Sequence, residues 1–187
     1  TSLRGAGSEG NNGTEILYNG TGRWIDFNST TKIKEFRVED LRITVSASGI
    51  GAIRIGNTST ATHPYSDNSF RERFIFRHLV LAGPGSTVAG KIGMSLTQVA
   101  TSDIAFVVSS GFESAFIFDR VTENHYDHLT AEAYVYGMQW LKQDAPAPGG
   151  TQDVVTAPTF RGPTFGTDGY SFKTLGASNI RLIAPWY

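Results

Sequence analysis

The chain has 187 residues and a formal net charge of −1 at neutral pH, from 16 basic and 17 acidic side chains. Its length fits one domain that can bury a core without disulfide or metal staples. The balanced charge excludes the basic footprint of a nucleic-acid-binding protein. The lack of cysteine excludes disulfides, thiol nucleophiles and thiolate metal sites. The longest uncharged runs are too short for a membrane helix, so no membrane insertion is expected.

Many glycines, threonines and aromatic residues favour strands and turns over helices. Residues 1–13 are rich in glycine and serine and are expected to form a flexible N-terminal arm. The runs Thr14–Tyr18 and Gly22–Phe27 flank Asn19-Gly20, a turn signal that predicts a β-hairpin. Alternating or short apolar runs then predict further strands within Ile33–Val45, Ala52–Ile55, Phe74–Leu81, Ala89–Val99, Asp103–Ser109, Ser114–Val121 and Tyr170–Tyr187. Leu129–Leu141 alternates less cleanly and could form a strand or a short helix, of which the strand is preferred.

Two loops stand out between these strands. Residues Thr58–Ser69 are polar, and Asp144–Thr151 form a loop rich in proline and glycine. About nine or ten short strands with turns between them predict an all-β fold, an antiparallel β-sandwich or jelly roll. No internal repeat of roughly 20–50 residues is visible. We therefore expect a single β-sandwich domain over residues 14–187, preceded by the arm at 1–13.

The sequence offers no recognised catalytic motif, because it contains no nucleophile elbow, P-loop or H-E-x-x-H helix. Glu113 and Asp119 could face the same side of one strand, which is also ordinary for a solvated sheet face. His125 and His128 could both reach one metal ion, but with Asp127 they still lack a closed ligand shell. The expectation is therefore no catalytic residue, no metal and no cofactor.

Two polar loop segments are the candidate ligand-binding sites. The first holds His63, Tyr65 and Asp67, and the second holds His125, Tyr126, Asp127 and His128. Tyrosine supplies contact area, while aspartate and histidine hydrogen-bond to hydroxyl groups, and this combination suits a sugar. The alternative is that both segments are plain connections whose tyrosines pack on the core.

Short stretches of the chain are similar to a known group of domains. These are Trp24-Ile-Asp-Phe27, Leu41-Arg-Ile-Thr-Val45, Ile53-Arg-Ile-Gly56 with a polar loop reaching Tyr65, and Gly176-Ala-Ser-Asn-Ile-Arg-Leu-Ile183. They resemble β-sandwich domains at the C-terminal ends of bacteriophage tail fibres and related virion proteins. The resemblance implies host-surface recognition or capsid and tail architecture, commonly as a trimer, without a catalytic set.

The functional expectation follows from these observations together. It is a non-enzymatic phage virion structural or adhesion protein of tail-fibre, spike or capsid-decoration type, located on the virion and hence extracellular. Its expected partners are copies of itself, with a trimer favoured, other virion proteins and a cell-surface glycan. The alternatives are a free-standing carbohydrate-binding module or lectin, and a polysaccharide-cleaving enzyme.

Overall fold

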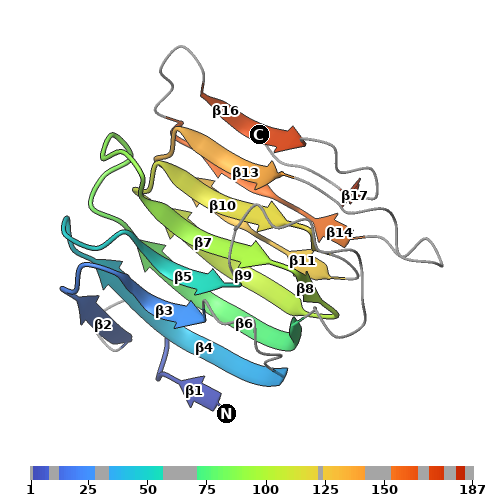
Figure 1. The fold of residues 1–187 in the computed structure, drawn as a ribbon, viewed down its shortest axis with the longest axis horizontal. Helices are drawn as coiled ribbons and strands as arrows, with labels where there is room; N and C mark the ends of the chain where they lie inside the picture. Colours follow the sequence, from blue (N-terminus) through green and yellow to red (C-terminus); the bar gives the residue numbers. More distant parts are fainter. Residues whose placement is uncertain are drawn as a thin grey trace.

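The computed structural model describes residues 2–8, 13–27, 34–56, 71–121, 124–141, 153–163, 169–174 and 180–183. All regular structure in these ranges is β, arranged in a large and a small sheet (Figure 1). The large sheet consists of β1 (Ser2–Arg4), β2 (Thr14–Tyr18), β4 (Lys34–Val45), β6 (Arg71–Ala82), β8 (Val99–Ala100), β9 (Asp103–Ser110), β11 (His125–Asp127), β12 (Thr130–Glu132), β14 (Asp153–Thr156), β15 (Thr159–Arg161) and β17 (Ile180–Ile183). The small sheet consists of β3 (Arg23–Phe27), β5 (Gly51–Ile55), β7 (Ile92–Thr97), β10 (Ser114–Asp119), β13 (Tyr136–Trp140) and β16 (Tyr170–Thr174).

Every strand pairing in both sheets is parallel. The chain alternates between the sheets, so that each turn adds strands to the large sheet and then one to the small sheet (Figure 1). This arrangement is a parallel β-solenoid. The prediction of an antiparallel β-sandwich or jelly roll is therefore wrong, although the all-β character is confirmed.

The local connections explain the error. The expected hairpin partners β2 and β3 lie in different sheets, because β2 pairs with β4 and β3 pairs with β5. An alternating apolar pattern only says that one face of a strand is buried, and it is the same in parallel and antiparallel sheets. The strands β4, β6, β9, β11 and β14 begin at unequal intervals, at Lys34, Arg71, Asp103, His125 and Asp153, so the structural repeat leaves no fixed period in the sequence.

The segment predicted as an N-terminal arm contains the short strand β1, which pairs with β4 so that Ser2 is level with Arg37. The Gly5 N–H then donates a 2.9 Å hydrogen bond to the carbonyl of Glu39. Residues 9–12 of this segment, and the predicted proline- and glycine-rich loop at 144–151, lie outside the described residues. The described part of the chain contains no helix that could span a bilayer.

The core lies between the two sheets and is rich in aromatic rings. Phe118 packs against Tyr126 with ring centroids 4.6 Å apart and against Trp140 at 4.4 Å. Trp140 in turn contacts Phe172 at 5.2 Å. Tyr126 and Phe118 are completely buried, as are aliphatic residues of both sheets. Buried hydrogen bonds also link one turn to the following turn. The Asn124 side chain accepts a hydrogen bond from the Ser102 N–H and donates one to the Val99 carbonyl.

Five turns of the large sheet bend at equivalent residues with left-handed backbone geometry. These corner residues are Asp40, His78, Phe106, His128 and Ala157, with φ between 46° and 56°. The residues on either side pair in register from turn to turn, so the corners lie level with one another along the solenoid. A residue with positive φ interrupts the pleat and turns the strand direction. The corner divides the sheet into a first limb before it and a second limb after it.

Candidate functional site

The outer side of the first limb carries a concentration of charged side chains, which we call the polar face. Val38, Phe76, Ile104 and Tyr126 are fully buried, so their neighbours in sequence point outward. The polar face consists of the outward residues Arg37, Glu39, Arg77, Asp103, His125 and Asp127, the corner residues Asp40, His78, Phe106 and His128, and Arg4 of β1. It crosses five neighbouring strands, β1, β4, β6, β9 and β11, or roughly 19 Å at the usual strand spacing.

Three of the corner side chains form a continuous stack along the solenoid. The ring of Phe106 lies 5.2 Å from the His78 imidazole on one side and 4.8 Å from the His128 imidazole on the other. The interplanar angles are 27° and 13°, so both faces of the phenyl ring are covered. Phe106 is still 46% exposed, which means that the stack presents ring edges to solvent. A sugar therefore cannot stack on a face of Phe106, but it can contact the edges and the imidazole nitrogens.

Carboxylates hold both ends of this stack. The Nδ1 atom of His78 lies 3.1 Å from Asp40 Oδ1, and the Nδ1 atom of His128 lies 2.7 Å from Asp127 Oδ1. A carboxylate only accepts hydrogen bonds, so in each pair Nδ1 carries the proton. Nε2 of each imidazole is then free to accept a hydroxyl proton when the ring is neutral, or to donate when it is protonated.

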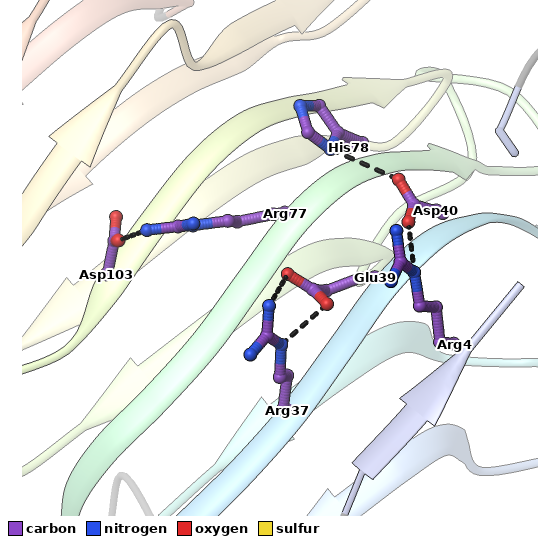
Figure 2. A network of polar contacts seen from close by, with 7 residues as sticks. All are labelled: Arg4, Arg37, Glu39, Asp40, Arg77, His78 and Asp103. Carbon is purple, nitrogen blue, oxygen red and sulfur yellow. Dashed lines mark hydrogen bonds and ion pairs between the residues drawn. The ribbon is translucent and has the colours of Figure 1, made fainter.

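Arginines complete the network on the first limb (Figure 2). Arg37 donates from Nη2 to Glu39 Oε1 at 2.7 Å, and its Nε lies 2.6 Å from Oε2, which is a bidentate pair. Arg4 donates from Nε to Asp40 Oδ2 at 2.8 Å, so Asp40 bonds both an arginine and His78. Arg77 reaches across from β6 to pair with Asp103 of β9. Neighbouring strands are thereby linked on the outside of the sheet.

These pairings fix the charge of two acidic side chains. The hydrogen bond from Arg37 lowers the pKa of Glu39, against the opposing effect of burial. The hydrogen bond from Arg4 lowers the pKa of Asp40, and His78 adds to the effect. The pKa of Arg37 is raised by its hydrogen bond to Glu39. All three groups are therefore charged at neutral pH, and neither carboxyl can serve there as a proton donor.

The structure brings together three residues of the predicted second segment. His125, Asp127 and His128 lie on the polar face, and His125 Nδ1 is 3.8 Å from Asp103 Oδ1. Tyr126, between them, points the other way and is fully buried against Phe118. Its prediction as a ligand contact is wrong, because β-strand alternation sends it into the core. The first predicted segment, with His63, Tyr65 and Asp67, lies outside the described residues.

The carboxyl pair considered for catalysis is separated. Glu113 precedes β10 and Asp119 ends it, which puts them roughly 20 Å apart along an extended strand. A glycosidase needs its two carboxyl groups within about 10 Å of each other. Asp119 contacts Arg120 instead, at 3.3 Å. Among the described residues, no group of three or more histidine, aspartate or glutamate side chains is placed to hold a metal ion.

No family model, curated protein or solved structure matches the chain.

Most of the polar face was not predicted from the sequence, including Arg37, Arg77, His78 and Phe106. A signal for it does exist. In four successive turns two residues, mostly polar, stand between two buried apolar ones: Val38-Glu-Asp-Leu41, Phe76-Arg-His-Leu79, Ile104-Ala-Phe-Val107 and Tyr126-Asp-His-Leu129. This spacing shifts the phase of the alternation by one residue. It marks the outward residue and the corner residue of each turn.

The chemistry that the polar face offers is that of ligand contact. It offers guanidinium and imidazole N–H groups, imidazole acceptors and the edge of an apolar ring within one surface. A guanidinium has five N–H donors, and the ion pairs described above occupy one or two of them. The remaining donors suit hydroxyl, carboxylate or sulfate oxygens of a ligand.

Proposed function

We propose that the protein is a non-enzymatic adhesion or structural protein of the virion type, which contacts host-surface glycans through the polar face. The observation that carries the proposal is the stack of His78, Phe106 and His128, held by Asp40 and Asp127 at its two ends. The stack fixes the positions of hydrogen-bonding groups on a β-sheet. Binding residues on a sheet are held more accurately than binding residues on a loop.

The repeating architecture supports binding to a polymer. Successive turns of a solenoid present equivalent positions along one line, and such surfaces recur in proteins that bind extended ligands. The polar face spans five strands, so it can contact several units of a chain-like glycan. Glu39 and Asp40 are ionised, so neither can be the carboxyl group that still carries its proton, which glycoside cleavage needs.

The virion setting rests on the sequence resemblance in the first third of the chain and its last twenty residues. The sandwich fold that the resemblance implied is wrong, so only the biological setting is retained. Self-association, with a trimer favoured, contacts with other virion proteins and a virion or extracellular location belong to the same proposal.

The test is a binding experiment with purified protein and immobilised neutral and acidic polysaccharides. We expect binding of at least one polysaccharide without release of reducing ends. The double variant H125A/H128A removes two imidazoles from the polar face, and we expect it to weaken binding about tenfold or more. The control T130A/T159A removes two outward side chains from the second limb of the same sheet, and it should bind like the wild type.

Three results would count against this function. Release of reducing ends would indicate an enzyme. Equal loss in both double variants would place the contact elsewhere or show a general loss of structure, which circular dichroism of each variant would reveal. No binding to any polysaccharide would remove the glycan from the proposal.

A further inference from the structure

The ion pairs of the polar face share an orientation. Six acid–base pairs lie on this face, formed by Arg4, Arg37, Arg77, His78, His125 and His128 with Glu39, Asp40, Asp103 and Asp127. The basic side chains are 41–73% exposed, whereas their acidic partners are only 8–29% exposed. The carboxylates therefore lie close to the sheet, and the cations and imidazoles form an outer layer above them.

This orientation is not a consequence of side-chain length. Four acid–base pairs are described elsewhere in the structure, and in each of them the carboxylate is more exposed than the base. Arg42, for example, is 45% exposed and its partner Glu15 48%, while Arg54 is 20% exposed and Asp26 32%. The outward placement of the bases is thus a property of the polar face.

We infer that the polar face binds a linear acidic polysaccharide, with the carboxylate or sulfate groups of the ligand facing the outer layer of bases. This inference rests on the proposed function and specifies its ligand. A negative group approaching the face meets the cations first, and Coulomb attraction weakens with distance, so the deeper carboxylates repel it less. The bases come from β1, β4, β6 and from β11 with the residue that follows it, on both sides of β9, so they form a row along the solenoid that can follow a polymer.

The inner carboxylates have a second effect. Each holds one or two bases in position, so that less side-chain entropy is lost when a ligand binds. These four carboxylates outnumber the three arginines, so the face has no positive long-range field while its imidazoles are neutral, and its attraction for an anion is a matter of contact. We therefore expect a modest salt dependence, far weaker than that of a basic groove on nucleic acid.

The experiment compares polymers that differ only in charge. The probes are polygalacturonate, hyaluronan and polysialate, each beside the same polymer with its carboxyl groups reduced to alcohols. We expect at least one acidic polymer to bind about tenfold more tightly than its reduced form. The variants R4Q and R77Q should each weaken binding to the acidic polymer severalfold and weaken binding to the reduced form by a smaller factor, because only the acidic polymer loses a charge-assisted contact.

The matched control is R42Q, which removes the same charge from a similarly exposed arginine on the second limb and should bind like the wild type. Equal binding of a polymer and its reduced form would overturn the inference and leave the glycan-binding function standing. Failure of every polymer, acidic and reduced, would overturn both. Tighter binding to duplex DNA than to any acidic polysaccharide would show that the face recognises polyanions other than glycans and would overturn the choice of ligand.

Discussion

The polar face and the aromatic core are built from the same strands and differ only in which residues of each strand they use. In β11, Tyr126 packs completely inside while His125 and Asp127 lie on the outer surface. In β6, Phe76 is fully buried while Arg77 forms an ion pair on the outside. A parallel sheet can therefore divide stability and recognition between its two faces, residue by residue.

Substitutions on the inward residues should change stability first, and binding only through unfolding. Substitutions on the outward residues should change binding with little effect on stability. Neighbouring residues in one strand then separate the two roles, because their side chains point to opposite faces of the same sheet.

The largest effect is expected for Tyr126→Ala. The side chain is fully buried against Phe118 and Trp140, and truncating a large buried aromatic ring costs about 3–5 kcal/mol of unfolding free energy. The neighbouring substitution His125→Ala should change stability by less than about 0.5 kcal/mol. Urea denaturation of both variants measures the difference. A similar loss of stability in the two variants would mean that Tyr126 and His125 do not face opposite sides of β11.

The same strand shows what the sequence could and could not predict. Alternation of apolar residues identified strands at Asp103–Ser109 and Ser114–Val121, and the structure has β9 and β10 there. The pairing direction was not readable, because alternation reports burial of one face and carries no information about the neighbouring strand. Asn19-Gly20 suggested a hairpin on local turn chemistry, but the chain crosses to the other sheet after β2.

The candidate site was partly predictable for a related reason. His125, Asp127 and His128 stand close together in the sequence and could be noticed as a cluster. Arg77 and Asp103 are 26 residues apart, and only the stacking of turns brings them into contact. The stack at the corners depends on the same register, so composition alone could not indicate it.

A smaller difference in unfolding free energy is expected between a glycine substitution at a corner and one within a limb. Ala157 adopts a positive φ of 46°, which costs an ordinary residue about 1–2 kcal/mol, whereas glycine adopts it freely. In Ala157→Gly the cost of the positive φ disappears. This gain offsets the loss of a methyl group and the greater chain entropy of glycine, so the unfolding free energy should change little. Ala131→Gly, in the buried part of β12, has no such gain and should lose about 1–2 kcal/mol. Equal losses in thermal or urea unfolding would contradict the corner geometry.

The smallest effect concerns the pH dependence of stability on the polar face. The folded-state pKa values of Glu39 and Asp40 are lowered, first by the hydrogen bonds from Arg37 and Arg4. A lowered folded-state pKa contributes stability that is complete above the unfolded-state pKa, near 4, and is lost as the pH falls through the folded-state value. Both carboxylates are therefore expected to stabilise the fold at neutral pH and to contribute nothing in strong acid.

The double variant E39Q/D40N removes this contribution while keeping the size of both side chains. At pH 7 it should be less stable than the wild type by roughly 0.2–1 kcal/mol for each ion pair lost. The difference should shrink as the pH falls below about 4, because the wild-type carboxylates then take up protons and lose the same interactions.

The variant R37Q removes the partner of Glu39 and should also reduce the pH dependence of stability. Urea unfolding between pH 3 and pH 7 measures the three curves. A stability difference that stays constant or grows toward low pH would show that these ion pairs do not stabilise the ionised form of the two carboxyl groups. The outward placement of the bases on the polar face would then need another explanation.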